Sequence, residues 1–363
     1  MKQYKTRYPG LRVRKQPTLD APIIGMLRDA ATIDVEHNVT VGPNIWHALG
    51  VSAGGSALRA SDDVTQPGIV YAAHIYSGTQ FTDEVNVTPP PIATGKTRLG
   101  VNVITGSGDV ARRALASGCN ALSIIDGFQL AADLANDQSI TVMARRYVRS
   151  MPPADPDLIF EGASSPHVVY LTPLNECDVI CYGSPEEIAR RAGYDREMWR
   201  KMKARGRKYA GGGFSVGTPD YTRPDICDAM RTHYAPLYNE GMAINYHLYS
   251  PTPTHAMDEW YEGRWRFLFT HCGFDPNPNL AGIYCDETGL DEGGVGGFPA
   301  HGMSASQIGA WCKRFLEYSR DGAIFAGLLR AAVIFQSGNV TDWRGYNVDY
   351  ALAEIGAAAR GNV

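Results

Sequence analysis

Two glutamates each close an apolar segment that is typical of a buried β-strand. Glu176 ends the segment HVVYLTPLNE, residues 167–176, and Glu287 ends LAGIYCDE, residues 280–287. Two carboxyl groups can cleave a glycosidic bond when one is protonated and the other ionised, because the acid protonates the leaving oxygen while the carboxylate attacks or stabilises the sugar carbon. We therefore predict that Glu176 and Glu287 are catalytic residues at the strand ends of a barrel.

The elements that would position these glutamates alternate between strand and helix patterns. Helix patterns cover residues 109–118 and 128–137, and a long helix begins at Ser184, where SPEE provides a cap, a proline in the first turn and early acids. Such alternation predicts a parallel sheet, and eight strands are the number that closes a (β/α)8 barrel. The predicted strands are residues 99–104, 120–126, 139–148, 167–176, 211–220, 243–250, 281–287 and 327–336.

Length and charge limit the architecture and the partners. The chain has 363 residues, and a (β/α)8 barrel needs roughly 250, so one small additional module fits. The net charge of −4 argues against a nucleic-acid partner, since such proteins present a basic face. The one dense basic stretch, residues 200–208, has the pattern of the solvated side of a helix.

The N-terminal part has a different pattern. Short alternating segments at residues 11–14, 31–35 and 46–51 are separated by Pro, Gly and Asn turns, which predicts a small β-barrel. The stretch TPPPIATGKT, residues 88–97, is a stiff linker because its prolines exclude helix and central strand. We predict a β domain at residues 1–87, this linker, and an α/β catalytic domain at residues 98–363.

The N-terminal segments resemble a bacterial SH3-like domain. The resemblance rests on the L-x-V-R opening at Leu11, Val13 and Arg14, on the P-I-I-G segment that ends at Gly25, and on the strand that carries Trp46. It implies attachment to a cell-wall or other polysaccharide surface. The alternative is a structural lid or spacer.

The chain from about residue 98 to its end is similar to the clan A glycoside hydrolases, a (β/α)8 superfamily. The Asn-Glu pair after the fourth strand is present as Asn175 and Glu176, and the glutamate after the seventh strand is Glu287. The resemblance implies that Glu176 is the acid/base and Glu287 the nucleophile of a retaining enzyme. The H-x-Y motif after the sixth strand, His247 and Tyr249, is similar to glycoside hydrolase family 5.

These motifs imply a role for each residue. The resemblance places Asn175 at the sugar 2-hydroxyl, where a hydrogen bond strengthens as positive charge develops. We expect Tyr249 to donate its hydroxyl to Glu287, and His247 to contact the substrate. Lowering the pKa of one carboxyl group and raising that of the other is what the mechanism requires.

Three further residues are predicted to bind substrate. Asn102 belongs to the GVN segment of the first strand, which is also similar to family 5, and Arg146 lies in MARRY on the third strand. Trp343 follows the eighth strand, on the side where active-site loops gather and aromatic rings stack on sugars. The sequence departs from family 5 on the early strands, because the expected arginine and histidine are not in their usual context. Arg145 and Arg146 stand there instead.

Other interpretations are open. A metal site at Asp126, Asp178 or Asp286 lacks a distinguishing ligand spacing, so we predict no metal and no cofactor. The barrel could be a non-catalytic carbohydrate-binding or scaffold protein, although both glutamates, Asn175 and the motif tyrosine are intact. It could also be a cell-wall lytic glycosidase targeted by the SH3-like domain. The identity of the sugar, its linkage and endo or exo action depend on loop shapes.

The seven cysteines are odd in number and scattered over apolar segments, so we predict reduced core residues. Cys177 and Cys181 have a C-x3-C spacing without a second ligand pair nearby. No apolar run is long enough to span a bilayer, and the polar start MKQYKTRYPG lacks the apolar core of a signal peptide. Secretion or attachment to the cell surface stays open, because a leader could have been removed.

Overall fold

The computed structural model describes side chains in the second part of the chain. They are described for residues 97–361 except residues 105–106, 138, 149–150, 162–164, 176–182, 254–257, 278, 292–295, 323–324 and 339–343. For the strands between residues 2 and 85, and for residues 341–343, the backbone alone is described. The chain separates into two compact units, Met1–Pro91 and Ile92–Val363. The predicted domain bounds at residues 87 and 98 stay a prediction.

The first unit consists of antiparallel strands. One sheet has the order β10-β1-β4, and the other has the order β5-β6-β8-β2-β3-β7 with β9 paired to β8. The three strands predicted from sequence coincide with β2, β4 and β6. The SH3-like resemblance depends on side chains outside the described residues and stays a prediction. The strands are β1 Lys2–Thr6, β2 Leu11–Arg14, β3 Ile23–Leu27, β4 Thr32–Val35, β5 His37–Val41, β6 Asn44–Val51, β7 Leu58–Ala60, β8 Gly68–Tyr76, β9 Thr79–Gln80 and β10 Thr82–Val85.

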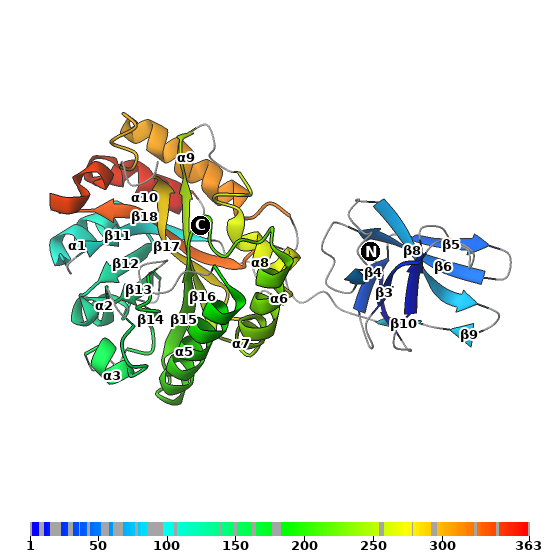
Figure 1. Ribbon diagram of the computed structural model, residues 1–363. Helices are drawn as coiled ribbons and strands as arrows, with labels where there is room; N and C mark the ends of the chain where they lie inside the picture. The colour runs from blue at the N-terminus through cyan, green and yellow to red at the C-terminus, as the bar shows by residue number, and fades with distance from the viewer. Residues whose placement is uncertain are drawn as a thin grey trace. The chain divides into compact units, whose positions relative to one another are not determined.

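The second unit is a closed barrel of eight parallel strands in sequential order, β11 to β18 (Figure 1). All eight predicted strands are present, so the predicted parallel barrel is confirmed. The strands are β11 Arg98–Val103, β12 Ala121–Ile125, β13 Thr141–Arg145, β14 Val169–Leu171, β15 Lys208–Phe214, β16 Ala243–Ser250, β17 Ile283–Leu290 and β18 Leu329–Ser337.

Several of these strands end elsewhere than predicted, and two of them, β14 and β17, carry the predicted glutamates or lead to them. β14 stops at Leu171, well before Glu176, and β17 continues to Leu290. Pro173 has no N–H group for the ladder, which explains the early end of β14. An isolated bridge between Val148 and Leu174 then holds the segment that leads to Asn175.

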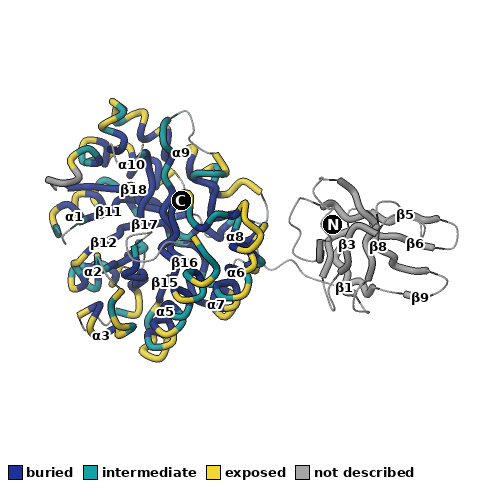
Figure 2. Tube along the Cα trace, viewed as in Figure 1, coloured by how far each residue is buried: buried dark blue, intermediate teal, exposed yellow. Residues whose placement is uncertain are grey.

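Helices surround the barrel and bury one face each against it (Figure 2). α5 begins as predicted: the Ser184 side chain accepts a hydrogen bond from the Glu187 N–H, and a proline stands in the first turn. No helix in the described part of the chain is long and apolar enough to cross a membrane. The helices are α1 Gly108–Ala116, α2 Phe128–Leu134, α3 Pro156–Ile159, α5 Pro185–Ala204, α6 Pro224–His233, α7 Ala235–Asn239, η3 Arg264–Arg266, α8 Phe267–Thr270, α9 Ala305–Tyr318, η4 Thr341–Tyr346, η5 Asp349–Ala351 and α10 Leu352–Arg360.

The barrel interior changes from apolar to polar along its axis. Small and apolar strand residues, among them Ala121, Met143 and Ala243, form one buried cluster. Farther along the same strands, Ser123, Arg145 and other buried residues are polar. Buried polar groups are costly unless they are paired, so their concentration at one end of the strands indicates a functional site there. These residues are Asn102, Ser123, Arg145, Asn245, His247 and Asp286.

One buried arginine fixes the backbone just before Asn175. Arg191 on α5 is fully buried, and its Nη2 donates to the carbonyl oxygens of Leu174 and Gly212. A side chain at Gly213 would collide with the Leu174 oxygen at 2.6 Å, and the φ of this residue is +62°. The segment after β14 and the neighbouring β15 are therefore held together at Leu174, two residues before the predicted acid.

The described cysteines agree with the prediction of reduced core residues. All five are buried and free. Cys177 and Cys181 lie outside the described residues. The five are Cys119, Cys227, Cys272, Cys285 and Cys312.

Candidate active site

The polar cluster lies at the C-terminal ends of β13, β16 and β17, which is the end of a (β/α)8 barrel where active sites are found. Arg145 is the last residue of β13, and His247 and Tyr249 lie two residues apart in the second half of β16. Because side chains alternate along a strand, His247 and Tyr249 share one face.

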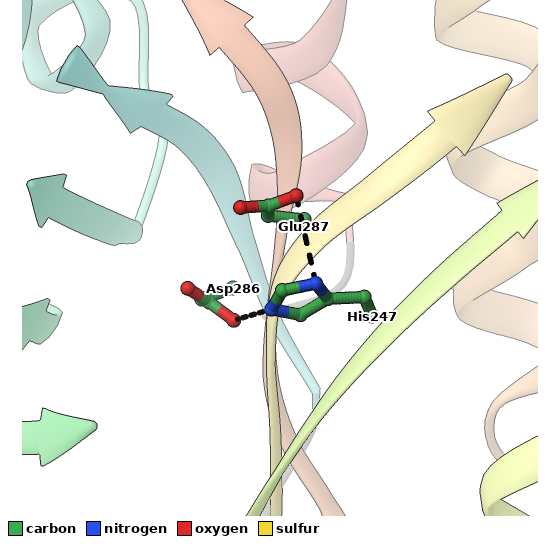
Figure 3. A group of neighbouring side chains, drawn as sticks. All are labelled: His247, Asp286 and Glu287. Atoms are coloured by element: carbon green, nitrogen blue, oxygen red, sulfur yellow. Dashed lines mark ion pairs between the residues drawn. The ribbon is translucent and has the colours of Figure 1, made fainter. Parts of the chain in front are cut away.

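Asp286 and Glu287 are consecutive residues of β17, yet both side chains reach His247 (Figure 3). Regular alternation would send them to opposite faces of the strand. The pairing register between β16 and β17 shifts here, so that Tyr246 pairs with Cys285 whereas His247 pairs with Glu287. This irregularity is a β-bulge, which re-aims a side chain and is common beside active sites.

Glu287 is the carboxylate of this cluster with access to solvent. It is 8% exposed, whereas Asp286 is 0% exposed. The Tyr249 hydroxyl donates to its Oε2 at 2.9 Å, which is the hydrogen bond predicted from the H-x-Y motif, and Arg145 Nη2 donates to its Oε1. Both donors hold this carboxylate in one orientation.

Arg145 connects the cluster. Its Nη1 donates to Asn175 Oδ1 at 2.5 Å and lies 3.0 Å from His247 Nε2 and 3.3 Å from Asp286 Oδ2. The guanidinium is almost fully buried. A buried charge of this kind needs anionic partners, and the two consecutive carboxylates of β17 supply them.

Asp286 is paired on two sides. Its Oδ1 lies 2.9 Å from His247 Nε2, and its Oδ2 faces Arg145. Complete burial alone would raise the pKa of the Asp286 carboxyl group, but the charge of Arg145 and the contact with His247 outweigh burial and lower this pKa to about 2. Asp286 is therefore ionised throughout the neutral pH range.

This lowered pKa predicts a pH-dependent stability. In the unfolded chain the pKa of an aspartate is about 3.9, so the unfolded state binds the proton first as the pH falls. The stabilisation by Asp286 is then complete above about pH 4 and is lost as the pH falls towards about 2, at a cost on the order of 2 kcal/mol. We expect the difference in melting temperature between the wild type and Asp286→Asn to shrink over this interval.

A matched control is Asp126→Asn, because burial raises the pKa of Asp126 despite the nearby Arg146. A carboxyl group with a raised pKa makes the folded state more stable, not less, as the pH falls and the group binds its proton. Asp126→Asn should therefore still lose melting temperature between pH 5 and 2, as the wild type does. Parallel melting curves of the wild type and Asp286→Asn between pH 5 and 2 would contradict the assignment to Asp286.

His247, Asp286 and Glu287 are also a possible set of metal ligands, since one ligand atom from each lies within 4.8 Å of the others. However, the Arg145 guanidinium already contacts all three residues. A divalent ion would have to share this space with a buried positive charge. The donor set therefore does not fit a metal while Arg145 is in place.

The structure shows where three predicted substrate-binding residues lie, and their contact with substrate stays a prediction. Arg146 is not part of the cluster: its Nε lies 3.3 Å from Asp126 Oδ1, and its Nη2 pairs with Glu161. Asn102 is fully buried and donates from Nδ2 to the Asp286 carbonyl oxygen at 3.1 Å. His247 is fully buried as well. Asn102 and His247 therefore support β17 from within the barrel in this structure.

Three other residues named from the sequence lie wholly or partly outside the described residues. Glu176 and Asp178 lie outside the described residues, and of Trp343 only the backbone is described, in η4 after β18. Asn175, the residue before Glu176, is in the cluster through its bond to Arg145. Tyr346 at the end of η4 donates to Asp291 Oδ1 at 2.8 Å, which ties this segment to the end of β17.

Sequence patterns did not single out two residues that are central in the structure, Arg145 and Asp286. Arg145 is two positions from Met143, whose side chain lies in the barrel interior, and this spacing could have favoured it over Arg146. The MARRY segment has no polar–apolar alternation that would show which face is internal. For Asp286 the sequence suggested only a possible metal site, because the bulge that turns this residue inward has no signal in the sequence.

Neither a protein-family model nor a curated protein matches the sequence. Solved structures resemble it weakly. ZgEngAGH5_4 in complex with a cellotriose is 11% identical, covers 73% of this chain and 96% of its own, and has a TM-score of 0.45. A β-mannanase from Streptomyces thermolilacinus with mannohexaose is 12% identical, covers 71% of this chain and 86% of its own, and has a TM-score of 0.41. A Bacteroides ovatus GH5 xyloglucanase with a XXXG heptasaccharide is 10% identical, covers 87% of this chain and 95% of its own, and has a TM-score of 0.42. Because these TM-scores lie below 0.5, the fold assignment rests on the closed barrel itself.

Proposed function

We propose that the protein is a retaining glycoside hydrolase that acts on a poly- or oligosaccharide by double displacement. The observation that carries the proposal is the setting of Glu287: a carboxylate in the C-terminal half of barrel strand β17, 8% exposed and held by Tyr249 and Arg145. A fixed, ionised carboxylate is what attack on an anomeric carbon requires.

In the proposed mechanism, a Glu287 oxygen forms a bond to the anomeric carbon while the glycosidic bond breaks. Glu176 donates its proton to the leaving oxygen. Glu176 then removes a proton from a water molecule, which attacks the same carbon and releases Glu287 as a carboxylate. This mechanism predicts carboxyl groups about 5 to 5.5 Å apart. Asn175 lies one residue before Glu176, and Arg145 orients its amide towards the same centre.

The remaining assignments complete the proposal. Trp343 would stack on a sugar ring, and residues 1–87 would form an SH3-like domain that attaches the barrel to a polysaccharide surface. A non-catalytic scaffold is less favoured, because it would have no need for a nucleophile-like carboxylate held by two donors. Glycoside hydrolases with the proposed mechanism need no cofactor.

The role of Glu176 is tested by changing the leaving group. We expect Glu176→Ala to lower the turnover of natural sugars by roughly 10²- to 10⁴-fold, the usual range for loss of general acid–base catalysis. With aryl glycosides that carry an acidic phenol, the variant should form the glycosyl ester at a rate closer to that of the wild type. Their leaving group needs no proton. Initial rates on nitrophenyl glycosides, cell-wall material and polysaccharides measure the difference.

Product stereochemistry supplies the second readout. Added azide should accelerate Glu176→Ala on aryl glycosides and give a glycosyl azide of the starting anomeric configuration, because the anion attacks the glycosyl ester where the base is missing. Equal losses on all leaving groups, or an inverted product, would remove Glu176 from the acid/base role. Wild-type protein that is inactive on the whole substrate panel would favour the scaffold interpretation.

A further inference from the structure

An exposed tyrosine follows β13 at the end of the barrel where the polar cluster lies. Tyr147 is 43% exposed and stands two residues beyond Arg145, the last residue of β13. A single exposed aromatic side chain is common on protein surfaces and indicates little by itself. What distinguishes Tyr147 is the direction of its side chain, which follows from the pairing of β13 with β14.

The pairing of these two chain segments keeps its register beyond the last residue of β13. Met143 pairs with Val169, and Val148 forms a parallel bridge with Leu174, five residues farther along both chains. No residue is therefore inserted into either segment between the two pairs. Side chains of such a paired, extended segment point alternately to its two faces.

Tyr147 therefore shares the interior face of β13 with Met143 and Arg145. The Met143 side chain belongs to the apolar cluster inside the barrel, and Arg145 belongs to the polar cluster above it. Arg146, which is out of phase with them, lies outside the polar cluster and pairs with Asp126, as alternation requires. Tyr147 is thus one step nearer to the open end of the barrel than Arg145, on the same face.

The backbone that carries Tyr147 is held from two sides. The Tyr147 N–H donates a hydrogen bond to the Asp126 carboxyl group at the end of β12, and this carboxyl group also lies 3.3 Å from Arg146 Nε. On the other side, Val148 is bridged to Leu174. An aromatic ring on a fixed backbone loses little conformational freedom when it meets a ligand, which favours binding.

The proposed reaction directs the leaving sugar to this side of the barrel. β13 is four strands from β17 in either direction around the closed barrel, so it lies opposite the strand that carries Glu287. The two carboxyl groups of a glycosidase flank the scissile bond. Glu176, the proposed acid, directly follows Asn175, which Arg145 contacts from the end of β13. The leaving sugar therefore points away from Glu287 and towards the ends of β13 and β14.

We propose that Tyr147 is a specificity-determining residue whose ring stacks on the first sugar of the leaving group. This inference rests on the proposed function and narrows its substrate class to glycosides that carry a sugar on both sides of the cleaved bond. The apolar C–H face of a sugar ring fits the flat face of a tyrosine, and burying both removes apolar surface from water.

Two leaving groups test the inference in the full-length protein. Oligosaccharides of glucose, mannose and xylose carry a leaving sugar, whereas the corresponding glycosyl fluorides release a fluoride ion that offers no surface for stacking. We expect Tyr147→Ala to lower kcat/KM on oligosaccharides by roughly tenfold. The loss on the matching fluoride should be at least about fivefold smaller, because this substrate makes no contact with the ring.

Three further variants separate stacking from other roles of Tyr147. Tyr147→Phe keeps the ring and should recover most of the loss on oligosaccharides, whereas Tyr147→Leu keeps apolar volume without a ring and should behave like Tyr147→Ala. Tyr350→Ala is the matched control, since Tyr350 is 49% exposed and lies in η5; it should not distinguish the two leaving groups. Equal losses of Tyr147→Ala on oligosaccharides and fluorides overturn the inference, and so does a phenylalanine variant as impaired as the alanine variant.

Binding separates a failure of the inference from a failure of the proposed function. Glu287→Gln, which lacks the nucleophile, is titrated calorimetrically with the same oligosaccharides, with and without Tyr147→Ala, and we expect the second change to weaken binding by roughly tenfold. If the wild type hydrolyses no glycoside but binding depends on Tyr147 in this way, the proposed function fails and the sugar contact stands. If the wild type hydrolyses oligosaccharides but neither binding nor kcat/KM depends on Tyr147, the inference alone fails. Absence of both hydrolysis and binding overturns both.

Discussion

Replacing Glu287 by alanine is expected to abolish turnover on every glycoside, with a loss of roughly 10⁴-fold or more, as for other enzymes that lose their nucleophile. No glycosyl ester can form without this carboxylate, so an acidic leaving group should not rescue the variant. Initial rates with dinitrophenyl and natural substrates measure the loss. This outcome differs from that expected for Glu176→Ala, where the leaving group decides the size of the effect.

Azide distinguishes the two glutamates further. In Glu287→Ala the small anion can occupy the vacated space and attack the anomeric carbon directly, which gives a glycosyl azide of the opposite anomeric configuration. Proton NMR of the product identifies the anomer. Full activity of Glu287→Ala would exclude Glu287 from the mechanism. Azide products of the same configuration from both variants would mean that the two roles are assigned wrongly.

The second large effect is expected from Arg145→Gln. This variant removes the guanidinium that contacts Glu287, Asp286 and Asn175. Loss of one donor to a reacting charge costs on the order of 10²- to 10³-fold in kcat, and we expect a loss of at least about 10²-fold here. The melting temperature should fall as well, because two buried carboxylates lose their cation.

Arg146→Gln is the matched control, with the same substitution one residue later. Arg146 pairs with partly exposed carboxylates of Asp126 and Glu161, and such pairs contribute about 1 kcal/mol or less each. We expect kcat/KM to change by less than about tenfold. A larger loss for Arg146→Gln than for Arg145→Gln would support the direct sugar contact predicted from the sequence and contradict the structural assignment of Arg145.

Much of the fold could be predicted because its signals are local. Apolar runs of strand length alternate with amphipathic helices, and this pattern is sufficient to predict eight strands and a closed parallel barrel. The hydrogen bond between Tyr249 and Glu287 was predictable for a similar reason. The H-x-Y spacing places His247 and Tyr249 on one face of β16, and the glutamate at the end of the next strand lies within reach of that face.

Local sequence patterns were therefore enough to predict the order of the strands and the face that His247 and Tyr249 share. The tertiary structure alone decided that Arg145 rather than Arg146 enters the cluster, that Asn102 is buried beneath β17, and that Asp286 and Glu287 both turn inward. Strands covered on both faces carry no polar–apolar alternation, so their sequences do not show which residues point into the barrel. That choice depends on the register between strands far apart in the chain, and the bulge in β17 exists only relative to its neighbours β16 and β18.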